Sequence, residues 1–261
     1  MTHHGERVVL CMKWGTLYSP DYVNVLYSAT KKYVSGSFRF VCLTDDAYGL
    51  KPGIEALPIP DIGLRPEHYQ SGAWPKLSVF LTDLYGLKGR ALFIDLDTVI
   101  AASINEMFDL QGEFIAIDSR PWKYSSGPPR TGTGIFAFNL GSMGWLVEEL
   151  MNNLDANVED FIIEQDFIHS SLRDISYWPE GWVISFKYHL RRPLFADRFQ
   201  QPKPPPQSAK IVAFHGRPRP SDLLGGYRGN WDVFPHYGSG AVHWMCDYWV
   251  EHGGQLPMAV K

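Results

Sequence analysis

Short apolar runs that end at polar or acidic residues recur along the first half of the chain, with a helix-like stretch between them. Residues 8–13, 38–43 and 91–94 read as strands, and Pro20 opens a segment with helical spacing of its apolar residues. This alternation predicts an α/β fold with a mixed, mainly parallel sheet flanked by helices. A chain of 261 residues is long enough to bury a substantial core.

The second half is less regular but continues the same theme. Residues 119–134 are rich in Gly, Pro and Ser and are expected to be irregular. No linker divides the chain convincingly, so we expect one domain over residues 1–261. Further strands are predicted at 54–59, 114–117, 135–140, 183–186 and 211–214, and further helices at 75–85, 142–151, 160–172 and 240–251.

The sharpest local feature is Asp95-Leu96-Asp97, which directly follows the apolar run 91–94. In open α/β sheets, ligands bind at the carboxyl ends of strands. Two carboxylates placed there repel each other unless a cation lies between them. Hard divalent ions, Mn²⁺ or Mg²⁺, prefer such oxygen ligands. The pattern therefore predicts a metal site, with a solvent-exposed acidic turn as the alternative.

A second strand-end motif is His215-Gly216-Arg217-Pro218-Arg219, after the run 211–214. His215 is a candidate third metal ligand, and Gly216 permits close approach of the backbone. The forked guanidiniums of Arg217 and Arg219 suit phosphate. Residues 185–230 hold nine Lys or Arg and two Asp in a chain of net charge −4. This basic segment indicates either a specific anion site or a solvated loop.

Together, the two motifs resemble those of the GT-A-fold glycosyltransferases, in particular family 8, the glycogenin-like and bacterial galactosyltransferase-like enzymes. Asp95-Leu96-Asp97 matches the family's Asp-x-Asp signature, and the segment from His215 is similar to its late His-x-Gly-x-x-Lys-Pro element, shortened and with Arg for Lys. Segments 134–139 and 164–166 resemble two intermediate motifs in the expected order. The resemblance covers about residues 8–220.

The resemblance implies a nucleotide sugar, with UDP as the expected nucleotide, as donor and a glycan or other hydroxyl compound as acceptor. Residues 1–100 would form the nucleotide-binding half and 101–261 the sugar and acceptor half. The metal ligands would be Asp95, Asp97 and His215. Residues expected to contact the donor are Lys13, Trp14, Tyr18, Asp45, Lys76, Asn139, Gly216 and Arg219, and the expected catalytic residues are Gln165, Asp166 and Arg217.

The implied reaction is a metal-dependent sugar transfer with retention at the anomeric carbon, in which the ion and Arg217 stabilise the leaving diphosphate. Two other readings stay open. The run through Asp95 and Asp97 also fits the Asp-x-Asp loop of haloacid-dehalogenase-like phosphatases, with Asp95 as nucleophile and Asp97 as general acid. Abundant Trp and Tyr also suit a non-catalytic module that binds carbohydrate or nucleotide.

Composition restricts the expected partners and cellular location of the protein. Mild acidity argues against nucleic acid as a partner. No apolar run approaches the ~18 residues that span a bilayer, and the start shows no signal-peptide pattern. Three cysteines without a Cys-x-x-Cys favour a reducing, cytoplasmic location. Peripheral contact with a membrane and the oligomeric state are left open.

Overall fold

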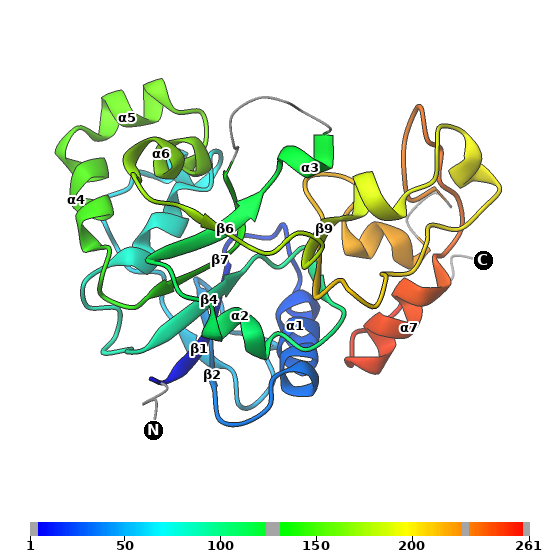
Figure 1. The fold of residues 1–261 in the computed structure, drawn as a ribbon, viewed down its shortest axis with the longest axis horizontal. Coiled ribbons are helices and arrows are strands. Elements are labelled where there is room, and N and C mark those ends of the chain that lie inside the picture. Colours follow the sequence, from blue (N-terminus) through cyan, green and yellow to red (C-terminus); the bar gives the residue numbers. More distant parts are fainter. Residues whose placement is uncertain (1–4, 124–130, 226–229, 258–261) are drawn as a thin grey trace.

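The computed structural model describes residues 5–123, 131–225 and 230–257. Its main feature is a seven-stranded sheet in the order β3-β2-β1-β4-β7-β6-β8 (Figure 1). Neighbours among β1 to β4 are parallel, whereas β7 runs antiparallel to both β4 and β6. The carboxyl ends of β1, β2 and β4 therefore meet at one edge, where β7 begins. The strands are β1 (Arg7–Lys13), β2 (Arg39–Thr44), β3 (Glu55–Leu57), β4 (Arg90–Ile94), β6 (Phe114–Asp118), β7 (Thr131–Asn139) and β8 (Ser176–Tyr177).

Both faces of this sheet are covered, because alternate strand residues point to opposite sides. Val9 and Cys11 of β1 belong to the core that includes α1 (Pro20–Tyr33). Val8 and Leu10 belong to a second core on the other face. That face is covered by the 3-10 helix η2 (Trp74–Phe80), α4 (Gly144–Asn152) and α6 (Glu164–Ser171). Each fully buried Val or Leu contributes roughly 1.5–3 kcal/mol.

A smaller sheet, ordered β5-β10-β9, is joined to the large one through the Asp-x-Asp segment. Only residues 95–97 separate β4 from β5, so these residues turn the chain from one sheet into the other. The segments that follow β9 and β10 pack with α7 at one end of the molecule (Figure 1). These elements are β5 (Thr98–Ile100), β9 (Val183–Ser185), β10 (Ile211–Ala213), the π-helix η3 (Phe186–Leu190), the 3-10 helices η4 (Ala196–Arg198) and η5 (Pro220–Leu224), and α7 (His243–Glu251).

Strand β7 starts at Thr131, four residues before the predicted start. Its two glycines make the segment look irregular in the sequence, but they are strand positions without room for a side chain. A Cβ on Gly132 would lie 3.0 Å from the Cβ of Ile117, and one on Gly134 would lie 3.3 Å from Asp95 Oδ2. Residues 124–130 of the stretch predicted to be irregular lie outside the described residues.

Two predicted helices differ from the structure by more than three residues at one end. The helix predicted at 75–85 ends at Phe80, and Tyr85 has a φ of 55°, which no right-handed helix accommodates. The helix predicted at 160–172 is broken at 161–163, where the backbone is extended and Glu164 N–H donates to Gly72 O at 2.8 Å. The shorter helices α2 (Asn105–Asp109), α3 (Arg120–Lys123), α5 (Leu154–Asp160) and η1 (Pro66–Tyr69) complete the described elements.

Candidate functional site

The Asp-x-Asp segment lies where three strand ends meet. Asp95 N–H donates to Gly134 O at 2.8 Å, which joins the end of β4 to the start of β7. Phe214 N–H donates to Asp97 O at 3.0 Å, which places the end of β10 beside the second aspartate. His215 follows directly, so the backbone brings the two motifs predicted from the sequence side by side.

Asp95 takes part in a buried charge network. Lys76 Nζ lies 3.0 Å from its carboxylate and 3.2 Å from Glu164 Oε1, and Thr133 Oγ1 donates to the same Glu164 oxygen at 2.6 Å. Burial raises the pKa of Asp95 while Lys76 opposes that rise. Burial opposes the charge of Lys76, but the two carboxylates outweigh it and raise its pKa. Lys76 therefore holds Asp95 in place, as a positioning residue.

Asp97 has a different environment. Tyr18 Oη donates to Asp97 Oδ2 at 3.1 Å. Burial, followed by the nearby charge of Asp95, raises the pKa of Asp97 to about 7. The guanidinium of Arg219 lies 5.5 Å from the centre of the Tyr18 ring, and its buried Nε has no hydrogen-bond partner among the described residues. An added cation would therefore stabilise the charged form of the Asp97 carboxylate.

A cavity of about 520 Å³ opens beside these aspartates. Trp14 is fixed in its wall by a 2.9 Å hydrogen bond from its indole Nε1 to Tyr69 O. At the end of β2, Asp45 accepts a hydrogen bond from Gly15 N–H at 2.8 Å. The residues that line the cavity are Met12, Trp14, Gly15, Thr16, Leu17, Tyr18, Tyr69, Gln70, Ala73, Lys76, Asp95, Leu96 and Asp97.

Lys13 is the predicted donor contact from β1 that this cavity does not include. Its side chain is buried, and it alternates with Met12 and Trp14, which do line the cavity. Strand alternation explains the outcome, since neighbouring residues point to opposite sides of the sheet. The prediction that Lys13 contacts the donor is therefore not supported by its position.

His215 is held between two aromatic rings, those of Trp122 and Tyr188, each 5.7 Å away between ring centres. Its Nε2 lies 2.7 Å from Ser185 Oγ. Lys187 Nζ donates to His215 O at 2.6 Å, and burial, followed by the charge of Arg191, lowers the pKa of Lys187. Sequence reasoning missed Lys187 as an individual residue, although it lies in the basic segment.

The two arginines of the late motif differ in position. Arg217 is 73% exposed and lies 3.9 Å from Asp222, on the outer surface. Arg219 is the one that reaches Tyr18 and hence Asp97. Gly216, with φ +70°, makes the turn between His215 and Arg217. Arg228, also counted in the basic segment, lies outside the described residues.

The residue of α6 that lies in the Lys76 network is not one of the two residues predicted to be catalytic. Glu164, its first residue, is buried in the Lys76 network. Gln165 Oε1 accepts a 3.3 Å hydrogen bond from Thr133 N–H, and Asp166 is partly buried in the first turn. The break at 161–163 turns the helix so that its first residue points inward, which no helical periodicity predicts.

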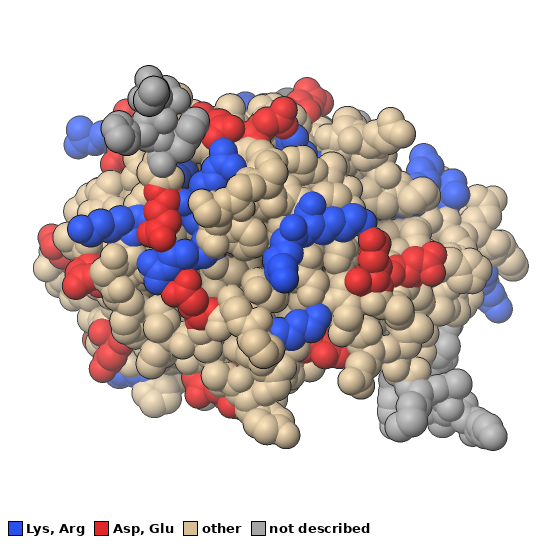
Figure 2. All heavy atoms as spheres, turned by 90° about the horizontal axis from the view of Figure 1, so that it is seen from below, with Lys and Arg blue, Asp and Glu red and all other residues tan. Residues whose placement is uncertain are grey.

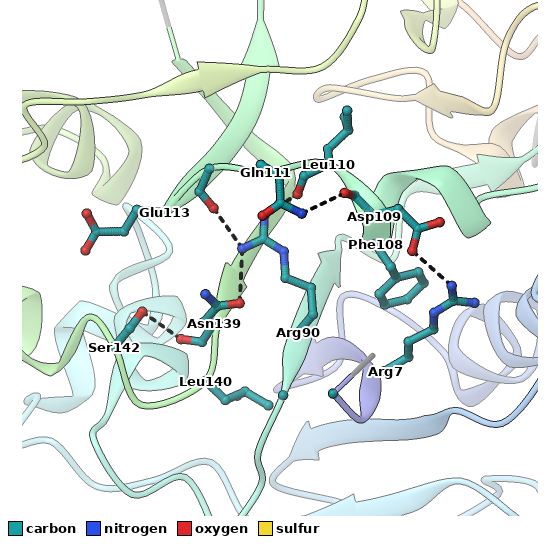
Figure 3. A pocket seen from close by; sticks show the side chains of 13 residues that line it. Arg7, Arg90, Phe108, Asp109, Leu110, Gln111, Glu113, Asn139, Leu140 and Ser142 are labelled. Atoms are coloured by element: carbon teal, nitrogen blue, oxygen red, sulfur yellow. Dashed lines mark hydrogen bonds and ion pairs between the residues drawn. The ribbon is translucent and has the colours of Figure 1, made fainter. Parts of the chain in front are cut away.

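Asn139 lies at the opposite edge of the sheet, and its predicted place beside the sugar is wrong. It pairs with Arg90, the first residue of β4, whereas Ile135 pairs with Ile94 at the Asp-x-Asp end. Asn139 Oδ1 accepts a 3.3 Å hydrogen bond from Arg90 (Figure 3). The antiparallel direction of β7 accounts for the error, because it places the strand's start, rather than its end, at the functional edge.

The predicted metal ligands were tested against this geometry. Across residues 5–123, 131–225 and 230–257, no three His, Cys, Asp or Glu side chains gather closely enough to hold a metal ion. Asp95 faces Lys76 and His215 faces Ser185. Chemically, the two aspartates offer the oxygen ligands that a hard divalent cation prefers, and burial disfavours the bare charge of Asp97. Ligation by Asp95, Asp97 and His215 stays a prediction.

Several solved glycosyltransferases share this fold. The galactosyltransferase LgtC, solved in complex with donor and acceptor sugar analogs, is 13% identical, with 97% of this chain and 98% of that chain covered and a TM-score of 0.58. GlyE of Streptococcus pneumoniae TIGR4 is 14% identical over 95% of this chain and 60% of its own, with a TM-score of 0.58. The bifunctional glycosyltransferase WbbM is 13% identical over 98% and 51%, with a TM-score of 0.56.

These likenesses confirm the predicted fold class: the chain has the GT-A fold, a mixed, mainly parallel sheet flanked by helices. The sequence matches no protein-family model and is not significantly similar to any curated protein. In the part of the chain that the structure describes, no helix is both long and apolar enough to cross a membrane.

Proposed function

We propose that this chain is a glycosyltransferase that moves a sugar from a nucleotide-diphosphate sugar, UDP being the expected nucleotide, to a hydroxyl group of an acceptor. The observation that carries the proposal is the position of Asp95 and Asp97. They occupy the turn between the two sheets, beside a cavity of about 520 Å³, on a fold that galactosyltransferase LgtC shares from end to end. Ligands bind at this edge in open α/β sheets.

The nucleotide would occupy the cavity beside the ends of β1 and β4, with Asp45 approaching it from the end of β2 through its contact with Gly15, which lines the cavity. Trp14 offers an indole face whose orientation is held by Tyr69 O, and Asp45 offers a carboxylate that already accepts one N–H group. An aromatic face stacks on a base, and a carboxylate accepts hydrogen bonds from base or ribose. Tyr18 extends the aromatic wall towards Asp97 and so towards the diphosphate.

Asp95, Asp97 and His215 would hold a Mn²⁺ or Mg²⁺ ion, which supplies positive charge to the diphosphate oxygens. Arg219 would contribute a second cation from the side of Tyr18. The proposed role of Arg217 in stabilising the leaving group requires its exposed side chain to turn inward from Asp222. Gly216 would let the diphosphate approach the backbone.

Chemically, the bond between the anomeric carbon and the diphosphate oxygen breaks, and the electron pair stays on that oxygen. A bond forms to the acceptor oxygen, whose proton leaves to the departing phosphate in the retaining course that we propose. Lys76 keeps Asp95 oriented throughout, through its 3.0 Å contact. Gln165 and Asp166 are the proposed contacts to the transferred sugar, from the first turn of α6.

The test is release of UDP from UDP-galactose and UDP-glucose, with and without Mn²⁺. Asp97→Asn keeps the size of the side chain and removes its charge, so we expect a loss of about 10²–10³-fold in turnover. Asp160→Asn, an exposed substitution of the same kind at the end of α5, is the matched control and should leave turnover unchanged. Undiminished metal-dependent turnover in Asp97→Asn would refute the proposal.

A further inference from the structure

A second cavity, of about 720 Å³, lies at the amino-terminal edge of the large sheet, opposite the Asp-x-Asp edge. Its walls come from the starts of β1 and β4, the segment between α2 and β6, and the end of β7 (Figure 3). The residues that matter for its chemistry are Arg7, Arg90, Phe108, Asp109, Glu113 and Asn139. Over the face seen in Figure 2, Lys and Arg side chains lie interspersed with Asp and Glu.

Arg90 is the cation of this cavity that has no carboxylate partner among the described residues. Its guanidinium donates to Gly112 O at 2.9 Å, Asn139 Oδ1 at 3.3 Å and Leu110 O at 3.4 Å. Its Nε is buried without a hydrogen-bond partner among the described residues. Partly buried charges are normally paired, because the lost hydration is otherwise uncompensated. Burial accordingly lowers the pKa of Arg90.

Of the other charges that line the cavity, two pair with each other and the third is exposed. Arg7 forms an ion pair with Asp109 at 3.0 Å and lies over the ring of Phe108. Glu113 is exposed and points away from Arg90 in Figure 3, and no ion pair joins the two. Within the part of the chain that the structure describes, the cavity therefore holds one guanidinium without a carboxylate partner, and one exposed carboxylate that points away from it. That balance favours a single negative charge over a dianion.

Asn139 supplies a second donor beside Arg90. Its Oδ1 is used by Arg90 and its backbone oxygen by Ser142, while its side-chain NH₂ makes no hydrogen bond within the described residues. Phe108, Leu110 and Leu140 add an apolar wall. A ligand with one carboxylate and a compact body, such as a sugar acid, would find a guanidinium, an amide donor and apolar contact here.

We propose that this cavity binds the carboxylate group of a small ligand through Arg90 and Asn139, at a site separate from the donor site. The inference does not depend on the proposed transferase activity, because none of its residues touches the Asp-x-Asp edge. It also accounts for Asn139, which the sequence singles out and the donor site leaves unused.

The test uses glucuronate as the probe, glucose as its uncharged counterpart and inorganic phosphate as the dianion, at constant ionic strength. Thermal unfolding and saturation-transfer NMR report binding to the full chain. We expect glucuronate to raise the unfolding temperature, whereas glucose has no effect and phosphate has a smaller one. Phosphate stabilising more than glucuronate, or no effect of glucuronate, overturns the assignment.

Two variants locate the site. Asn139→Asp places a carboxylate within 3.3 Å of Arg90. The new carboxylate would pair with the Arg90 guanidinium in place of the ligand, while the contacts of Arg90 with backbone carbonyl groups are preserved. We expect it to weaken glucuronate binding by about tenfold or more. Arg90→Gln should also weaken glucuronate binding, and it provides a second test if the variant folds. Asp97→Asn, at the other edge, should bind glucuronate as the wild type does. Equal binding by Asn139→Asp and wild type contradicts the proposal.

Discussion

Lys76 offers the most demanding test of how the Asp-x-Asp edge is held together. Its side chain is 6% exposed and lies 3.0 Å from Asp95 and 3.2 Å from Glu164. Each contact is worth about 5 kcal/mol of Coulomb attraction at an effective dielectric constant of 20, before the cost of desolvation. Removing one partner of a buried pair costs about 3–5 kcal/mol net, since the remaining charges stay buried. Lys76→Met should therefore lower the free energy of unfolding by that amount.

The measurement is chemical and thermal unfolding of Lys76→Met against Lys88→Met, an exposed lysine as matched control. For a chain of this size the loss corresponds to a fall of about 6–10 °C in unfolding temperature, whereas the control should stay within about 0.5 kcal/mol of the wild type. The double variant Lys76→Met/Glu164→Gln removes one of the two stranded carboxylates and should regain at least about 1 kcal/mol. Equal stability of the two lysine variants would refute the reasoning.

Three further outcomes follow from the same geometry. Arg219→Ala should reduce donor turnover more than Arg217→Ala, because only Arg219 reaches Tyr18; equal losses would contradict this order. In the UDP-release assay, Trp14→Ala should raise the KM for the nucleotide sugar more than it lowers kcat. An effect on kcat alone would show that Trp14 does not contact the base. Arg39 lowers the pKa of Glu55, so this pair contributes stability above the usual Glu range and loses it as pH falls. Glu55→Gln should therefore cost less than about 1 kcal/mol at neutral pH, since both side chains are over a third exposed, and nothing in acid; an unchanged difference at low pH argues against it.

The position of the candidate functional edge was predictable from the sequence because its signal is local. An apolar run of strand length followed by Asp-x-Asp marks where a buried strand ends, and parallel strands deliver their ends to one edge. The same logic predicts Trp14 and His215 near the aspartates: Trp14 lines the same cavity, and the residue before His215 bonds to Asp97 O. In these cases, the residue directly after an apolar run in the sequence lies at the carboxyl end of a strand in the fold.

Asn139 and Lys13 show where local patterns stop. A run of alternating apolar residues reads the same in either direction, so the sequence of β7 does not reveal that it is antiparallel to β4. Which end of β7 meets Asp95 depends on that direction alone. For Lys13, the strand is confirmed, but Lys13 is not among the residues that line the cavity, and a polar residue at a strand's end gives no indication of which side it points to.

Glu164 marks a third kind of limit. A helix predicted from 160 to 172 places Glu164 in its second turn, and the sequence favours Gln165 and Asp166 as the residues that enter the site. The structure starts α6 at Glu164, because Ile163 is extended and Glu164 N–H bonds to Gly72 O. That contact joins segments about ninety residues apart, as their numbering shows, and long-range contacts of this kind leave no periodic trace in the sequence.

The two cavities lie at opposite ends of shared strands, and this separation limits how they can communicate. Five residue steps along β4 lead from Arg90 to Asp95, about 16–17 Å at the rise of an extended strand. At an effective dielectric constant of 20, a carboxylate at Arg90 would change the electrostatic energy of Asp95 directly by no more than about 1 kcal/mol across this distance. A change in donor affinity on binding glucuronate that exceeds about fivefold would therefore have to be transmitted by displacement of β4 or β7. A much larger change that Asn139→Asp does not abolish would instead indicate that the carboxylate binds near the aspartates themselves.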